Sequence, residues 1–139
     1  MSGFLLDTNV ISELVKAKPE PRVTAWIEDI DESLLYLSVL TLGEMRKGIT
    51  SLRDGARRVS LEAWLYRDLV LRFSDRIISI DLDVADRWGR IARNARKKPL
   101  PVIDGLLAAT ALHYDLTLVT RNIADIAGSG VTVFNPWEA

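Results

Sequence analysis

Four acidic residues occupy positions where a carboxylate could do chemistry. Each follows an apolar run or opens an apolar helical segment; they are Asp7, Glu44, Asp104 and Asp125. Four carboxylates gathered in one place repel one another strongly unless a cation lies among them. Oxygen donors without cysteine or histidine select Mg²⁺, or Mn²⁺ in its place, rather than Zn²⁺. The fold would have to supply one edge at which all four acids meet.

Each acid also has a simple structural role open to it. Asp7 could cap the helix that follows it, and Thr41 with Glu44 has the spacing of a capping box. Asp104 could complement a helix dipole, and Asp125 could belong to a short helix that starts near Asn122. Taken singly, these roles explain each acid as well as a metal site does. Only convergence of the four favours the metal.

The elements that must position these acids alternate along the chain. The pattern predicts strands at 4–6, 34–39, 76–80, 116–119 and 131–134, and helices at 10–14, 21–30, 41–52, 56–73, 83–97 and 102–114. Such alternation predicts an α/β fold with a mainly parallel sheet and helices on both faces. Ligands bind outside the carboxyl ends of such strands, where the four acids are expected to converge. Asp104 is the most telling, because it opens the most apolar helix, where an acid is costly unless it is used.

Length and composition limit the other possibilities. The chain has 139 residues and no cysteine, so it fits one domain without disulfides or a thiolate metal site. Its formal net charge is −1, so nucleic-acid binding must depend on a local basic patch. No apolar stretch approaches the ~20 residues of a membrane span, and no signal peptide is recognisable. We therefore expect a cytoplasmic protein that does not bind membranes.

Four segments of the chain, in order, give it a family resemblance. They are Leu5-Leu6-Asp7-Thr8-Asn9-Val10-Ile11, Ser38-Val39-Leu40-Thr41-Leu42-Gly43-Glu44, Pro101-Val102-Ile103-Asp104-Gly105-Leu106-Leu107-Ala108-Ala109-Thr110-Ala111 and Leu118-Val119-Thr120-Arg121-Asn122-Ile123-Ala124-Asp125. With these segments the sequence resembles PIN-domain ribonucleases of the VapC type, with a FitB-like character, which are toxins of type II toxin–antitoxin pairs. The resemblance covers essentially the whole chain. One departure is Ile126, where the family often has an aromatic residue.

The resemblance implies a single PIN domain over residues 1–139, folded as a three-layer α/β/α sandwich. It also implies a Mg²⁺-dependent endoribonuclease whose metal-binding and catalytic acids are the four named above. Four polar residues would position them: Thr8, Asn9, Thr120 and Asn122. The expected partners are RNA, a second copy of the chain, and a small DNA-binding antitoxin whose C-terminal segment covers the site. Larger toxin–antitoxin assemblies are a further expectation.

The residue inventory is consistent with metal-dependent cleavage. The only histidine is His113, so acid–base catalysis by two histidines is excluded. Glu44 is expected to orient or deprotonate the attacking water, while the three aspartates hold the metal. RNA must also be attracted to this negative pocket, and the cations that flank the acids are candidates for its backbone: Arg46, Lys47, Arg96, Lys97, Lys98 and Arg121. Each of them could equally be part of a solvated helix face.

Two other readings can be compared with this one. A haloacid-dehalogenase-type phosphatase also begins with a strand that ends in aspartate, but it needs a second aspartate two residues later, where this chain has Asn9. The alternative left open is a PIN module that binds RNA or a protein partner without cutting. The complete set of four acids argues against it.

Overall fold

Five short strands form the centre of the protein in a computed structural model that describes residues 2–94 and 99–139. They are β1 (Phe4–Leu6), β2 (Leu35–Ser38), β3 (Ile77–Ile78), β4 (Thr117–Val119) and β5 (Val133–Phe134). All neighbouring strands are parallel, in the order β3-β2-β1-β4-β5. The predicted α/β fold is confirmed. The third strand is shorter than the predicted 76–80, because only two of its residues pair with β2.

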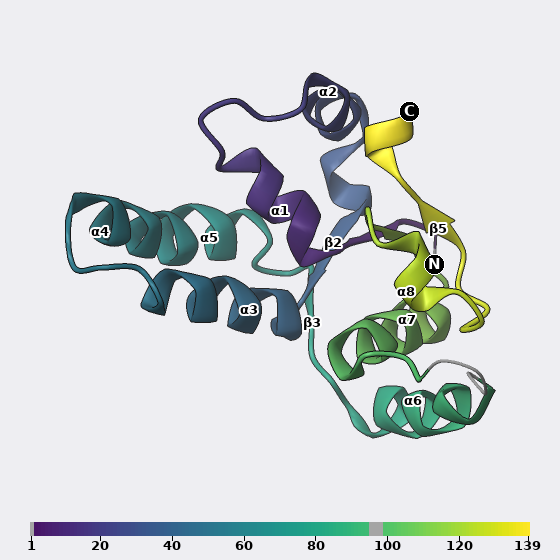
Figure 1. Ribbon diagram of the computed structural model, residues 1–139. Coiled ribbons are helices and arrows are strands. Elements are labelled where there is room, and N and C mark those ends of the chain that lie inside the picture. The colour runs from purple at the N-terminus through teal and green to yellow at the C-terminus, as the bar shows by residue number, and fades with distance from the viewer. Residues whose placement is uncertain (1, 95–98) are drawn as a thin grey trace.

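Helices connect the strands in the crossover manner that parallel pairing requires. The longer ones are α1 (Thr8–Leu14), α2 (Pro21–Asp29), α3 (Val39–Thr50), α6 (Leu82–Asn94) and α7 (Val102–Tyr114). Shorter turns are η1 (Glu32–Leu34), α8 (Ile123–Ile126) and η3 (Pro136–Glu138). Figure 1 shows α6 and α7 side by side below the sheet, with α3, α4 (Ala56–Ala63) and α5 (Val70–Arg72) extending to the left.

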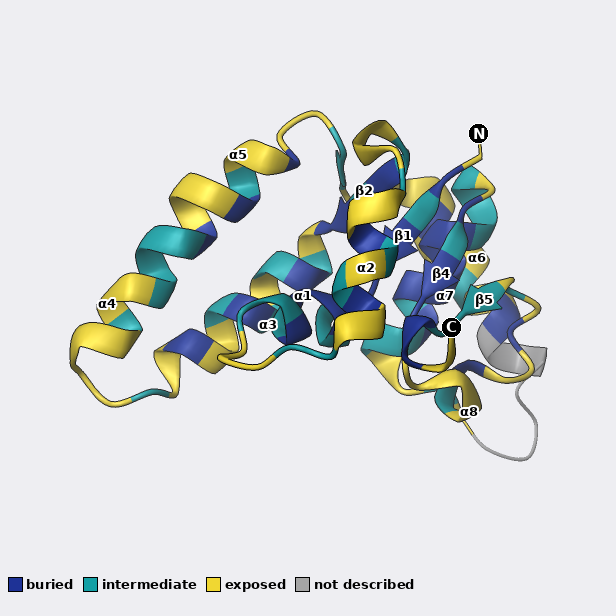
Figure 2. Cartoon of the chain, turned by 90° about the horizontal axis from the view of Figure 1, so that it is seen from above, coloured by how far each residue is buried: buried dark blue, intermediate teal, exposed yellow. Residues whose placement is uncertain are grey.

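The predicted helix at 56–73 forms with one irregularity. It consists of α4 (Ala56–Ala63), a π-helical segment η2 (Trp64–Leu69) and α5 (Val70–Arg72). In the π-helical segment the amide of Val70 donates to the carbonyl of Leu65, one residue farther back than in an α-helix. The wider turn keeps Leu65 and Leu69 buried on the same side. Figure 2 shows the outer faces of α4 and α5 exposed to solvent.

The two faces of the sheet have separate cores because successive side chains in a strand point to opposite faces. Leu6 and Leu37 pack with α1, α2, α3 and η2 in one cluster. Leu5 and Leu118 pack against α7 in the other. Behind α7, a third cluster joins it to α6. These layers correspond to the predicted α/β/α sandwich, and Figure 2 shows the buried residues concentrated in the strands and the inner helix faces.

One contact between α6 and α7 depends on a glycine. A Cβ atom on Gly105 would lie 3.0 Å from Nε1 of Trp88, so a larger side chain would push the two helices apart. Asp104 precedes this glycine. The close packing of α7 on α6 thus helps to fix where Asp104 lies.

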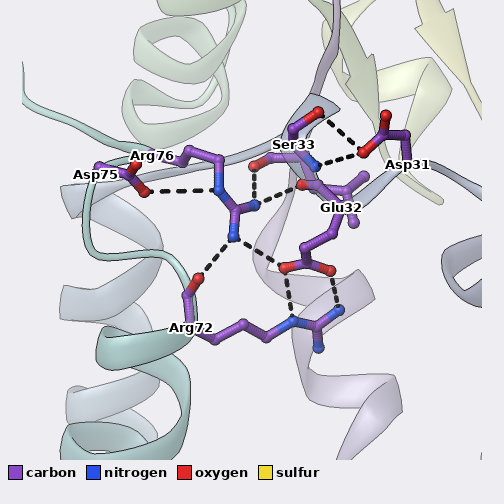
Figure 3. A network of polar contacts seen from close by, with 7 residues as sticks. Asp31, Glu32, Ser33, Arg72, Asp75 and Arg76 are labelled. Atoms are coloured by element: carbon purple, nitrogen blue, oxygen red, sulfur yellow. Dashed lines mark hydrogen bonds and ion pairs between the residues drawn. The ribbon is translucent and has the colours of Figure 1, made fainter.

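Arg76 directly precedes β3 and joins several elements at the amino end of the sheet (Figure 3). Its guanidinium donates to the carbonyls of Glu32, Leu35 and Arg72 at 2.6–2.7 Å, and to the Glu32 carboxylate at 3.0 Å. Arg72 binds the same carboxylate through two nitrogens, at 2.8 and 2.9 Å. This cluster joins the end of α5 to η1 and β2. Leu35 is the first residue of β2 and Ile77 the first of β3, so the cluster lies at the amino ends of these strands.

Candidate active site

The register of the central strands brings Asp7 and Thr120 together. Leu6 pairs with Val119, so the residues that follow them leave β1 and β4 side by side. The backbone amide of Asp7 donates to the Val119 carbonyl at 2.9 Å, and the Thr120 hydroxyl donates to Asp7 Oδ2 at 2.8 Å. Both side chains are buried. Parallel pairing alone therefore places this carboxylate at the predicted edge.

Asp7 uses its two carboxylate oxygens differently. Oδ1 accepts the backbone amide of Thr8 at 2.7 Å and so caps α1. Oδ2 accepts from Thr120 and, at 3.3 Å, from the side-chain amide of Asn9. Burial raises the pKa of Asp7 above its ordinary value, the bonds from Thr120 and Thr8 oppose that rise, and the nearby Glu44 adds to it.

Glu44 reaches the site from α3. Ser38 caps this helix through a bond from the amide of Leu40, so the helix begins at Val39. The Thr41–Glu44 capping box is therefore wrong: Thr41 lies inside the first turn and is fully buried. The Glu44 carboxylate instead accepts a 2.5 Å bond from the hydroxyl of Thr8. Thr8 thus links the second acid to the residue beside the first.

Asp104 lies in the first turn of α7 and is half-buried. Burial, followed in order of importance by repulsion from Asp7, Asp125 and Glu44, raises the pKa of Asp104 to about 6. Asp125, in α8, is also half-buried. The repulsion felt by Asp104 places all four predicted acids in one electrostatic neighbourhood.

A cavity of about 350 Å³ lies among three of these acids. Its lining includes Asp7, Glu44 and Asp104, together with Thr8, Asn9 and Asn122. The donor chemistry fits a hard divalent cation, because the carboxylates repel one another and no soft ligand is present. Within residues 2–94 and 99–139, however, no three acidic or histidine side chains have the spacing of a ready-made metal site. A cation would have to draw the carboxylates closer.

The polar residues predicted to position the acids are distributed unequally. Thr8, Asn9 and Thr120 all bond to an acid through their side chains. Asn122 lines the cavity, but its bond to the Thr120 hydroxyl, at 3.0 Å, uses the backbone amide. Its side chain does not cap α8. The roles of all four residues stay predictions.

The predicted RNA-binding cations lie in different surroundings. Arg46 donates to Glu62 at 2.9 Å and lies over the ring of Tyr66, so it faces α4. Lys47 is exposed on α3. Arg121 lines the cavity with the acids. The remaining three, Arg96, Lys97 and Lys98, lie outside the described residues.

Three residues outside the predicted site also line this cavity: Glu13, Lys16 and Trp137. Glu13 had a detectable signal, because it lies three residues after Val10 on the apolar side of α1, where an acid is unusual. Trp137 had no such signal, since its place beside α1 depends on how the C-terminus returns to the sheet.

Among the residues that the structure describes, no helix is long and apolar enough to cross a membrane.

Sequence similarity identifies the family of the chain. The model of the PIN domain family matches residues 4–124 of the chain. The chain belongs to the PIN-domain family. Among characterised relatives of this PIN protein, Toxin FitB of Neisseria gonorrhoeae is 37% identical, with 97% of this chain and 99% of the relative covered. VapC ribonuclease Y4jK of Sinorhizobium fredii is 35% identical, with 97% and 98% covered.

Solved structures with the same fold come from toxin–antitoxin complexes. The crystal structure of FitAcB from Neisseria gonorrhoeae superposes with a TM-score of 0.93 at 36% identity, covering 98% of this chain and 99% of that one. The structure of FitAB bound to an IR36 DNA fragment gives a TM-score of 0.92 at 36% identity, with 96% and 95% covered. The fold and the family of this PIN protein are therefore those expected from its four segments.

Proposed function

We propose that this PIN protein is an endoribonuclease that hydrolyses RNA phosphodiester bonds with Mg²⁺ and acts as the toxin of a type II toxin–antitoxin pair. The observation that carries the proposal is the cavity that Asp7, Glu44 and Asp104 line together, with Asp125 near enough to repel Asp104. Relatives named as a toxin and as a VapC ribonuclease support it. The protein acts in the cytoplasm, where its RNA substrate is found.

The side chains divide the chemical work among themselves. Asp7, Asp104 and Asp125 would hold the cation, and a bound Mg²⁺ would supply Lewis acidity that activates water and neutralises charge on the phosphoryl oxygens. Thr120 and Asn9 donate to Asp7 and keep its carboxylate fixed. Glu44 would orient the attacking water and accept its proton, while the hydroxyl of Thr8 holds this carboxylate in place.

An antitoxin would complete the pair. The FitAcB and FitAB structures are named for complexes of a FitB-type chain with its partner. A small DNA-binding antitoxin with a C-terminal segment over the cavity would block access of RNA, and a basic side chain on it would satisfy the crowded acids. Two copies of the PIN protein would form a homodimer, which could join larger assemblies with the antitoxin.

A PIN module that binds RNA or a partner without cutting is the second candidate. One observation favours it: the described residues contain no ready-made group of three metal ligands. A module of this kind would bind RNA with or without Mg²⁺ and would leave it intact. Cleavage assays therefore separate the two candidates.

The test is cleavage of RNA by the partner-free protein with Mg²⁺, with EDTA, and as Asp7→Asn. Asparagine can still cap α1, so the variant should fold, which circular dichroism checks. We expect EDTA to abolish cleavage and Asp7→Asn to lower it by roughly 100-fold or more. A matched control is Asp54→Asn, because the Asp54 side chain is 99% exposed. Metal-independent cleavage, or full activity in Asp7→Asn, would refute the mechanism, and absence of cleavage by folded, Mg²⁺-loaded protein would favour the binding module.

A further inference from the structure

Glu13 is a buried acid that the proposed chemistry does not use. It is 4% exposed, and its carboxylate accepts the Lys16 ammonium and the backbone amide of Glu20, both at 3.0 Å. A bond from the side chain of Trp137 also reaches it. Lys16 lowers the pKa of Glu13, with burial acting against it, so the carboxylate is ionised at neutral pH. With three donors already bound, Glu13 is suited to holding its neighbours rather than to binding a metal.

The neighbours of Glu13 lead to a second cation. Trp137, from η3 at the other end of the chain, is buried, and the Arg121 guanidinium lies 5.2 Å from the centroid of its ring. The backbone amide of Arg121 donates to Oδ1 of Asn9 at 3.4 Å. Arg121 is itself exposed. Glu13 therefore holds Lys16 directly and Arg121 through Trp137. We call Lys16 and Arg121 the cationic rim.

The cationic rim lies between two hollows of the surface. One is the cavity of about 350 Å³ that contains the acids. The other, of about 460 Å³, is lined by Glu13, Lys16, Arg121 and Trp137, which it shares with the first, and by residues 18–21. The two hollows share both cations of the rim. A chain that leaves the acids in this direction would have to pass the rim.

An RNA strand has the matching charge pattern. The phosphate to be cut lies at the acids, and each neighbouring nucleotide adds another phosphate that must be attracted despite those acids. Lys16 gives one of its three ammonium protons to Glu13, and Arg121 carries five N–H donors, so both cations can still donate to a phosphate. Because Glu13 and Trp137 already hold Lys16 and Arg121, these two side chains lose less entropy when RNA binds.

We propose that the cationic rim binds the phosphate of the nucleotide next to the scissile one, with Glu13 and Trp137 as its positioning residues. The proposal rests on the proposed function for the location of the scissile phosphate. It makes Lys16 a substrate-binding residue, and it assigns the hollow beside the acids to the flanking part of the RNA.

The test measures RNA binding separately from cleavage. An Asp104→Asn protein in EDTA is titrated with a fluorescent single-stranded oligouridylate of about 12 nucleotides. The dissociation constant is followed from about 50 to about 200 mM salt. Lys16→Met and Arg121→Met should each reduce the slope of log affinity against log salt by about 0.7, and the double variant by about 1.4. Lys16→Arg keeps the charge and should keep the slope.

A matched control and a kinetic experiment complete the design. Arg67→Met removes an exposed cation of η2 and should leave the slope unchanged. In the otherwise unmodified enzyme, Glu13→Gln should raise KM for RNA by roughly fivefold and change kcat by less than about twofold, because the rim loses its support but the acids do not. A merely structural role of Glu13 would lower kcat and thermal stability together. Tighter RNA binding by Glu13→Gln would overturn its positioning role.

The outcomes separate this inference from the proposed function. Unchanged slopes and affinities in both methionine variants, with cleavage intact, would overturn the cationic rim and leave the ribonuclease standing. The expected loss of slope in a protein that cleaves no RNA would support the rim and refute the catalytic proposal.

Discussion

At the scale of single residues, Asp7 shows that capping a helix and serving a site are compatible. Its two carboxylate oxygens accept from different directions: Oδ1 from the amide of Thr8, and Oδ2 from Thr120 and Asn9. The sequence posed these roles as alternatives. The structure assigns the capping role to Oδ1, and Asp7 also lines the acidic cavity.

Asp104 gives a prediction on pH. Its pKa of about 6 in the folded protein lies above the ordinary 3.8, so the folded state holds a proton that the unfolded state has lost. The stabilisation from this group is complete below about pH 4 and is lost as pH rises through about 6. Asp104→Asn removes the titration. Without metal, the free energy of unfolding of the variant relative to wild type should rise by about 1–2 kcal/mol from pH 4 to pH 7. This energy is discounted because the Asp104 side chain is partly exposed.

Urea denaturation in EDTA, at several pH values, measures this difference in free energy of unfolding. Comparison of the two proteins at each pH cancels the titration of other groups, such as Glu32, whose pKa is lowered by Arg72. If the difference in free energy of unfolding between wild type and Asp104→Asn stays constant with pH, then burial and the other acids do not raise the pKa of Asp104.

At the scale of elements, the sheet edge and the helix ends decide where the acids lie. Ser38 caps α3 three residues before Thr41, the N-cap that the capping-box pattern indicated, so Glu44 lies farther along the helix and meets Thr8. At the amino end of the sheet, Arg76 holds η1, β2 and the end of α5 together (Figure 3). This second cluster is structural.

Arg76→Met should therefore destabilise the fold without touching the chemistry. The Arg76 side chain is 14% exposed, and its loss removes one donor from each of the carbonyls of Glu32, Leu35 and Arg72. We expect the free energy of unfolding to fall by about 2–3 kcal/mol, measured by urea denaturation. The exposed Arg67, replaced by methionine, should change it by less than about 0.5 kcal/mol. Equal effects of the two substitutions would mean that the Arg76 cluster adds no stability.

At the scale of the whole molecule, the acids come from both halves of the chain. Asp7 and Glu44 follow β1 and β2, while Asp104 and Asp125 lie in α7 and α8. A cation bound among them would link elements on both faces of the sheet. Binding that occurs only in the folded state stabilises the entire fold.

Mg²⁺ should consequently raise the melting temperature of the protein. At a concentration about 100 times its dissociation constant, the ion should stabilise the fold by about 2.7 kcal/mol. Asp7→Asn and Asp104→Asn should each reduce this shift, whereas Asp54→Asn should not. Differential scanning calorimetry with and without EDTA measures it, and an equal shift in all four proteins would place the bound ion elsewhere.

The sequence alone determined the parallel α/β fold and the four acids at its edge, because these depend on local patterns. Apolar runs of strand length, the helices between them and the position of each acid after a strand can all be read from neighbouring residues. The family resemblance rests on the same four segments, and the family match confirms it.

Contacts between side chains that are distant in the sequence depend on how the elements pack. Arg46 turns to Glu62, and Glu13 holds Trp137, a residue from the other end of the chain. No local pattern encodes these pairs, since they depend on how α3 packs on α4 and where the C-terminus returns to α1. Spacing along the chain fixes the order of elements and the faces they bury, whereas contacts between distant residues are fixed only by packing. The cationic rim is a contact of this second kind.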